Sequence, residues 1–223
     1  MQDLIRQEQF ELEVLERLNS KKFLSNLVLA GGTSLRLCRG LNRFSVDLDF
    51  WIVKELDAAR LFEELRTYLS QHYRILDSAD KYNTLLFELR SAGYPRSLKI
   101  EIRKEPKTLR TEEAIAYSKY STTQVLVRVV SGPDMMREKI AAFLDRGEVR
   151  DAFDVEFLLK KGEALDGAQE TLRKLLAGIR SLPKNDFSQK LGSLLEDDQR
   201  RYYSENKFRI LEQAIQERLA GNP

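Results

Sequence analysis

Two aspartates, Asp47 and Asp49, stand one residue apart in a stretch that is expected to form a β-strand. Side chains alternate between the two faces of a strand, so both carboxylates should share one face while Leu48 points to the other. Carboxylate oxygens bind hard divalent cations, and Mg²⁺ is usually held by one or two carboxylates together with substrate phosphates. The pair therefore predicts a metal site. The alternative is a polar, solvated strand face whose like charges have a basic partner.

A Gly31-Gly32 pair precedes the aspartates and follows an apolar strand at 27–30. Glycine has no Cβ, so the backbone can turn tightly and a phosphate can come close. Thr33-Ser34 then begins an expected helix at 33–40, and the free N–H groups and positive dipole end of a helix start attract phosphate. A Gly-Gly pair alone is mostly a turn, but followed by the aspartates it predicts phosphoryl or nucleotidyl transfer.

A third carboxylate, Glu101, lies in the alternating stretch 97–103, where Leu98, Ile100 and Ile102 are expected to face the core. If this strand pairs with the one at 46–53, Glu101 completes a three-carboxylate cluster with the aspartates. It could then act as a metal ligand or as the base for an incoming hydroxyl. Taken alone, Glu101 is a surface ion-pair residue.

Basic residues are densest around the same strand: Lys99, Arg103, Lys104, Lys107 and Arg110. One interpretation is contact with an RNA backbone beside the catalytic face. The other is a solvated, salt-bridged edge, because Glu101 and Glu105 dilute the positive charge.

A second polar block lies at 139–154, on two expected helices. Lys139 and Arg146 share one helical stripe, and Arg150 and Asp154 are one turn apart on the next helix. These cations could neutralise charge that develops on a triphosphate during transfer, with Asp151 or Asp154 orienting them or activating the acceptor. The alternative is that Arg150 and Asp154 only join two helices.

The order of expected elements predicts an α+β fold, with a mixed β-sheet domain over 1–131, expected to hold the catalytic motif, and a C-terminal helical bundle over 132–223. Helices are expected at 3–18, 33–40 and 57–71, and strands at 27–30, 46–53, 73–77, 83–91, 97–103 and 124–130. Beyond residue 132, helices are expected at 133–146, 148–161, 167–180, 186–197 and 199–219.

The chain has 223 residues, 42% of them hydrophobic, which suffices for a sizeable core. Its formal net charge of +2 gives no strong overall attraction to nucleic acid or membranes. The single cysteine, Cys38, excludes an internal disulfide and a cysteine-based zinc site, and the single histidine, His72, has no triad partners around it. The N-terminus lacks an apolar signal core, and no run approaches transmembrane length. We expect a cytoplasmic protein with no membrane partner.

The run Gly-Gly-Thr-x-Leu, then Arg-Phe-Ser-x-Asp-Leu-Asp-Phe, then Lys-x-x-Ala-x-x-x-Arg-x-x-x-Arg-Asp-x-x-Asp resembles the AbiEii/AbiGii nucleotidyltransferase toxins. These belong to the polymerase-beta-like nucleotidyltransferase superfamily and include the MenT-type toxins. The resemblance covers roughly residues 25–160. It implies that Gly31, Gly32 and Thr33 lie beside the triphosphate and that Ser45 contacts phosphate. Asp47 and Asp49 would carry Mg²⁺ or Mn²⁺, with Glu101 as the third acidic position. Lys139 would bind the nucleotide phosphates with Arg146 nearby, and either Asp154 or Asp151 would match the late acidic residue.

The resemblance also implies the reaction. A metal-dependent toxin would move NMP from an NTP to an acceptor, which the resemblance implies is the tRNA 3′ end. It would pair with an antitoxin encoded alongside. Two other hypotheses stay open. The same fold could modify a small molecule such as an antibiotic, or the protein could bind nucleotide without turnover.

Overall fold

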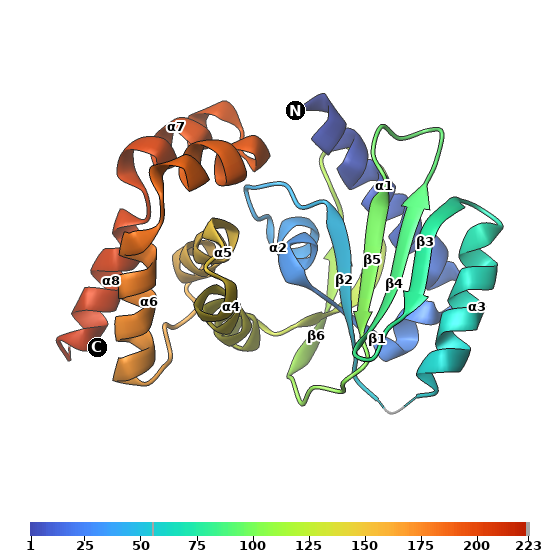
Figure 1. Ribbon diagram of the computed structural model, residues 1–223, viewed down its shortest axis with the longest axis horizontal. Helices are drawn as coiled ribbons and strands as arrows, with labels where there is room; N and C mark the ends of the chain where they lie inside the picture. The colour runs from blue at the N-terminus through green and yellow to red at the C-terminus, as the bar shows by residue number, and fades with distance from the viewer. Residues whose placement is uncertain (55, 222–223) are drawn as a thin grey trace. The chain divides into compact units, whose positions relative to one another are not determined.

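The structure is a computed structural model that describes residues 1–54 and 56–221. The chain divides into two compact units, Met1–Val130 and Ser131–Pro223. The first is built on a mixed sheet, and the second consists of helices (Figure 1). The α+β class that the sequence predicts is confirmed.

The central strands of the sheet unit are the ones that carry the motif residues. Its helices are α1 (Gln2–Ser20), α2 (Gly31–Arg39) and α3 (Ala58–Ser70), with a 3-10 turn at Phe23–Asn26. Its strands are β1 (Leu27–Ala30), β2 (Asp47–Ile52), β3 (Arg74–Asp80), β4 (Thr84–Arg90), β5 (Leu98–Arg103), β6 (Thr111–Ala116) and β7 (Val125–Val130). The strand order is β3-β4-β5-β2-β1-β7-β6. Strand β2 runs parallel to β5 and β1 parallel to β7, while the other pairs are antiparallel.

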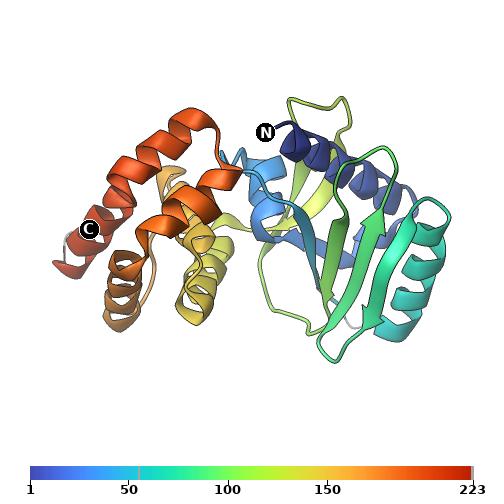
Figure 2. The ribbon, with the colours of Figure 1, turned by 45° about the horizontal axis from the view of Figure 1, so that its top comes forward.

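Helices α1 and α3 lie against one face of this sheet (Figure 2). Their apolar side chains share a single buried cluster with those of the strands. Alternate strand residues enter that cluster together with one stripe of each helix: Phe10, Leu15, Leu48, Phe62, Leu65, Phe87, Ile100 and Val127. Each such buried side chain contributes about 1.5–3 kcal/mol through removal of apolar surface from water. Helix α3 begins where the sequence predicts, because Asp57 accepts a hydrogen bond of 3.0 Å from the Arg60 N–H.

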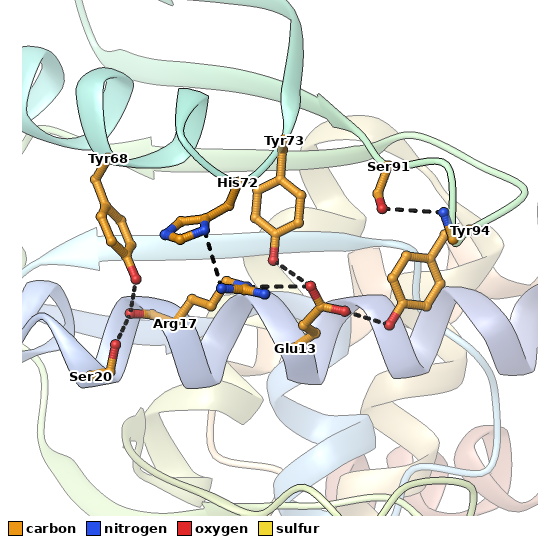
Figure 3. Close-up of polar contacts among 9 residues, drawn as sticks. Glu13, Arg17, Ser20, Tyr68, His72, Tyr73, Ser91 and Tyr94 are labelled. Carbon is orange, nitrogen blue, oxygen red and sulfur yellow. Dashed lines mark hydrogen bonds and ion pairs between the residues drawn. The ribbon is translucent and has the colours of Figure 1, made fainter.

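A polar cluster centred on Glu13 holds the middle of α1 to the end of α3 and to the β4–β5 connection (Figure 3). Its carboxylate accepts hydrogen bonds from the hydroxyls of Tyr73 at 2.9 Å and Tyr94 at 2.7 Å, and from Arg17 at 3.3 Å. Arg17 in turn lies 3.2 Å from Nδ1 of His72. Burial alone would raise the pKa of Glu13, but the three hydrogen bonds lower it below its ordinary value.

The helical unit contains α4 (Gly132–Arg146), α5 (Val149–Lys160), α6 (Gln169–Ser181), α7 (Asp197–Asn206) and α8 (Arg209–Leu219). Buried Glu156 connects three of these helices. It accepts hydrogen bonds from Lys160 at 2.6 Å, from the Tyr203 hydroxyl at 2.8 Å and from the Leu211 N–H at 3.2 Å. The last bond satisfies one of the free N–H groups at the start of α8.

Two helices expected near the C-terminus are wrong. Residues 186–197 form a π turn at Asp186–Leu191 and a 3-10 turn at Gly192–Leu194, closed so tightly that a Cβ at Gly192 would lie 3.0 Å from the Phe187 carbonyl oxygen. The helix expected at 199–219 is interrupted at Lys207, whose φ is +50°. This break lets Phe208 bury itself completely against Phe187 and Tyr203.

One strand, β6, was not predicted from the sequence. It is the edge strand beside β7, and its first residues, Thr111, Glu112 and Glu113, are exposed. Charged residues are a common feature of edge strands because they discourage pairing with another chain, but they also hide the alternation that identifies a strand.

No helix among residues 1–54 and 56–221 is both long and apolar enough to cross a membrane.

Candidate active site

The two aspartates lie on one face of the central strand β2. Leu48 and Phe50 are buried on the opposite face, whereas Asp47 and Asp49 are half-buried. Ala30, the last residue of β1, is the register partner of Asp49. The chain therefore leaves β1 directly beside the Asp49 side chain and begins α2 there.

Gly31 provides the space that the Asp49 carboxylate occupies. Its φ is +68°, in the region that favours glycine, and a Cβ added there would overlap Asp49 Oδ2 and lie 3.0 Å from Asp49 Cβ and Cγ. Helix α2 starts at Gly31 itself, two residues earlier than expected. Glycine is therefore needed at position 31 to leave room for the Asp49 side chain, independently of any ligand.

Gly32 is crowded by two further side chains. A Cβ at this position would lie 2.6 Å from Arg43 Nη2 and 2.8 Å from Ser45 Oγ. Arg43 is only 4% exposed, and its Nη1 donates to the Phe44 carbonyl oxygen at 2.9 Å. Sequence reasoning placed Ser45 in the site but gave Arg43 no role. The available signal was a lone arginine at the start of the run that leads to the aspartates.

Thr33, expected beside the triphosphate, is fully buried, and its hydroxyl donates to the Asp47 carbonyl oxygen at 2.6 Å. Gln7 of α1, a second residue that sequence reasoning missed, also bonds to the backbone at the start of β2. Its Nε2 donates to the carbonyl oxygens of Val46 at 3.1 Å and Ser97 at 3.2 Å. These bonds fix the start of β2 to α2, to α1 and to the residue that precedes β5.

Glu101 occupies the position beside Asp49. Strand β5 pairs with β2 in parallel, and the register places Glu101 opposite Asp49 and Lys99 opposite Asp47. The predicted pairing of these strands is therefore confirmed, and paired residues share one face of the sheet. Glu101 is exposed, and within residues 1–54 and 56–221 no three His, Cys, Asp or Glu side chains gather closely enough to hold a metal ion together.

A buried carboxyl group, Glu11, lies close enough to β2 to interact electrostatically with Asp47. Glu11 of α1 is inaccessible to solvent, and neither carboxyl oxygen has a hydrogen-bond partner. Burial, followed by the charges of Glu8 and Asp47, raises the pKa of Glu11 well above its ordinary value, and Arg36 opposes the shift. Neighbouring Glu8, unlike Glu11, has hydrogen-bond partners: its carboxylate accepts from Arg36 Nε at 2.7 Å and from the Ser118 hydroxyl.

The second motif forms an ion-pair cluster within the helical unit, with Lys139, Asp151 and Asp154 buried and Arg146 exposed. Lys139 of α4 lies 2.6 Å from Asp154 Oδ2 and 3.4 Å from Asp151 Oδ1, both on α5. Arg146 donates two hydrogen bonds to Asp151, at 2.6 and 2.7 Å. Asp151 thus orients both cations, and Asp154 is paired with Lys139. The two cations and two carboxylates balance in charge.

The donor set of the sheet unit fits a divalent cation. Asp47 and Asp49 supply oxygen ligands from one strand, which is held at its start by Gln7 and Thr33. The glycine turn accommodates the Asp49 carboxylate without a competing Cβ. A site of this kind, with two carboxylates and no further protein ligand gathered, suits an ion that also takes oxygens from substrate phosphates.

Comparison with protein families matches residues 13–218 to the family described as nucleotidyl transferase AbiEii toxin, of a type IV TA system. The chain belongs to the AbiEii nucleotidyltransferase toxin family. As an AbiEii protein it is a nucleotidyltransferase of a toxin–antitoxin system, and the family implies an NTP substrate and an antitoxin partner. Nucleotidyltransferases in general use an NTP together with a divalent metal ion.

Two solved structures share the fold of this AbiEii protein. The crystal structure of JHP933 from Helicobacter pylori is 20% identical in sequence, the match covers 95% of each chain, and the TM-score is 0.52. An H. pylori protein provisionally assigned as a nucleotidyltransferase is 21% identical, with 96% of this chain and 97% of that chain covered and a TM-score of 0.56. Identity at this level shows a common fold. No protein with a curated description matches the sequence.

Proposed function

We propose that this AbiEii protein transfers NMP from an NTP to the 3′ end of tRNA in a reaction that depends on a divalent metal ion and releases pyrophosphate. The observation that carries the proposal is the position of Asp47 and Asp49 on one face of β2, with the Asp49 carboxylate seated at the glycine turn that begins α2. The tRNA acceptor and the metal dependence go beyond what family membership gives.

The metal ligands in this proposal are Asp47 and Asp49. When bound, Mg²⁺ neutralises negative charge on the phosphates and orients them for displacement. The chain holds these ligands by their backbone, since Thr33 donates to the carbonyl oxygen of Asp47 and Gln7 holds the preceding residue. In this proposal Glu101, the register partner of Asp49 on the same face, accepts the proton of the acceptor hydroxyl.

The surface beside the aspartates favours a nucleic-acid acceptor. Lys99 and Arg103 are exposed on the same face of β5 as Glu101, one on either side of it. Lys107 adds a further cation, with its ammonium 4.3 Å from the ring centroid of Trp51 on β2. Exposed cations along a sheet face suit the repeated phosphates of an RNA backbone better than a single small acceptor.

The helical unit carries Lys139, Arg146 and Asp154, which keep in this proposal the roles that the family resemblance implies. Lys139 is proposed as a phosphate contact, and its ammonium lies 2.6 Å from Asp154 and 3.4 Å from Asp151. Arg146 reinforces Asp151 through two parallel hydrogen bonds. Because the cluster is neutral as a whole, it acts through the position of the Lys139 ammonium and supplies little net positive field.

The test is a transfer assay with Mg²⁺, total tRNA and each of four α-labelled NTPs in turn. We expect label in tRNA from one preferred nucleotide and at least about a 100-fold loss in Asp49→Asn. Asp77→Asn is the matched control, because Asp77 is exposed on strand β3 and the substitution removes the same charge. It should retain full activity.

Two results would contradict the proposal in different ways. Label that enters small alcohols or aminoglycosides but no RNA would replace tRNA with a small-molecule acceptor. Transfer that continues after chelation of divalent cations, or in Asp49→Asn, would show that the reaction does not depend on a metal ion held by Asp49.

A further inference from the structure

Arg43 is a buried cation at the glycine turn whose presence the nucleotide chemistry described above does not explain. Its guanidinium lies against Gly32, with Nη2 2.6 Å and Nη1 3.1 Å from the position that a Cβ would occupy. Ser45 Oγ lies 2.8 Å from the same position. The side chain is 4% exposed, and Nη1 is held by the Phe44 carbonyl oxygen at 2.9 Å.

A guanidinium keeps its charge at all relevant pH values, so it cannot escape the cost of burial by losing a proton. Such a group is retained in a protein interior when its donors have partners and its charge serves a purpose. Here it rests on the second residue of the turn, while the Asp49 carboxylate rests on the first, Gly31. The turn therefore brings a fixed positive group next to the ligands proposed for the metal.

The charges indicate what the guanidinium binds. A divalent cation on Asp47 and Asp49 would repel Arg43 and would be balanced by the two carboxylates alone. The triphosphate of an NTP carries more negative charge than one Mg²⁺ neutralises, so a further cation close by favours it. The planar fork of arginine matches the geometry of phosphate oxygens, which a lysine ammonium contacts only as a point charge.

We propose that Arg43 is a phosphate-binding residue of this nucleotidyltransferase, that its guanidinium donates to an oxygen of the NTP triphosphate beside Ser45, and that glycine at position 32 is required to admit it. The inference rests on the proposed function in one respect, namely that the sheet unit accepts an NTP. It gives the second glycine a purpose distinct from that of the first.

The experiment measures equilibrium binding of a fluorescent, nonhydrolysable ATP analogue in the presence of Mg²⁺, with GTP, CTP and UTP as competitors and with the corresponding monophosphates. The quantity of interest is the ratio of monophosphate Kd to triphosphate Kd. Arg43→Gln should lower this ratio by about tenfold or more, as expected when a charged hydrogen bond to the added phosphates is lost. Arg43→Lys should recover only part of it. Millimolar guanidinium ion added to Arg43→Ala should restore triphosphate binding.

Arg36→Gln is the matched control for a merely structural role. Arg36 lies on α2, its guanidinium is 4.4 Å from the Phe44 ring centroid, and it is paired with Glu8. Its loss should lower the melting temperature without changing the binding ratio. If Arg43→Gln fails to fold, Gly32→Ala replaces it, because the glycine has an ordinary φ and the new methyl group would displace the Arg43 guanidinium and Ser45 Oγ from the turn.

The outcomes separate the inference from the proposed function. A wild-type ratio near one would show no triphosphate site and would overturn both. A high wild-type ratio that is unchanged in Arg43→Gln and Gly32→Ala would overturn the role of Arg43 and leave the nucleotidyltransferase proposal standing. An equal fall of the ratio in Arg43→Gln and Arg36→Gln would reduce Arg43 to structural support.

Discussion

Replacement of Gly31 by alanine tests whether the empty space at this residue seats the Asp49 carboxylate. The substitution has a backbone cost and a steric cost. At a φ of +68°, any side chain costs about 1–2 kcal/mol relative to glycine. The added Cβ would also overlap Asp49 Oδ2 and lie 3.0 Å from Asp49 Cβ and Cγ, where carbon atoms normally stay about 3.5–4.0 Å apart. Because the overlap with Oδ2 is closer than these carbon contacts, the Asp49 side chain must move by roughly 1 Å or more.

A displacement of about 1 Å in a positioned group can lower a rate by about 100-fold. We therefore expect Gly31→Ala to lose about two orders of magnitude in kcat/KM for NTP transfer. Gly40→Ala isolates the backbone cost, because Gly40 ends the same helix with a φ of +75° and nothing lies within 4 Å of its Cβ position. Gly40→Ala should melt roughly 2–8 °C below the wild type, and Gly31→Ala should melt lower still because it adds the steric cost.

Label transfer from an α-labelled NTP gives kcat/KM for the two variants, and circular dichroism gives their melting temperatures. The reasoning would be refuted if Gly31→Ala kept wild-type kcat/KM, or if Gly40→Ala lost as much activity as Gly31→Ala. In the second case the strained backbone at either end of α2 would explain the loss, and the position of Asp49 would not.

Three further predictions concern buried ionisable groups. Lys139→Met leaves the Asp154 carboxylate buried without its Lys139 partner and should lower the free energy of unfolding in urea by about 3–5 kcal/mol. Adding Asp154→Asn should recover most of that loss without restoring transfer. Lys139→Met as stable as the wild type would contradict this. Because burial raises the pKa of Glu11, the native state keeps a proton that the unfolded chain releases above the ordinary pKa of 4.5. The free energy of unfolding therefore falls as pH rises from 4.5 towards the raised pKa of the native state. Glu11→Gln should therefore gain stability over the wild type increasingly from pH 5 to pH 8, as urea titrations at each pH can measure, and a difference independent of pH would disprove the shift. Burial also raises the pKa of the Cys38 thiol to about 12, so iodoacetamide at pH 8 should label it only after unfolding, and rapid modification of the native protein in mass spectra would argue otherwise.

The sequence predicted those features that depend on local spacing. Asp47 and Asp49 share a face because strand side chains alternate, and α3 begins at its predicted cap, Asp57. The alternation along β5 was equally visible, and the conditional pairing of this strand with β2 holds in the structure. Each of these follows from residues at most a few positions apart.

The features that the sequence did not predict depend on residues brought together by folding. Arg43 reaches Gly32 only because β1 and β2 pair. Gln7 bonds to Val46 and Ser97, which lie 39 and 90 residues further along the chain. The break at Lys207 likewise depends on the space that Phe208 fills among distant aromatic rings. Helical spacing alone continues through such a point without interruption.

The hydrogen bonds from Gln7 to the residues before β2 and β5 affect the choice of boundaries for truncated versions of this protein. The family similarity begins at residue 13, yet α1 begins at Gln2. An expressed fragment trimmed to the region of family similarity would lack Gln7, Glu8 and Glu11, and with them the hydrogen bonds that join β2 to the residue before β5. The start of the strand that carries Asp47 would be left without that support. Gene designs, purification tags and truncation libraries should therefore treat the whole of α1 as part of the enzyme.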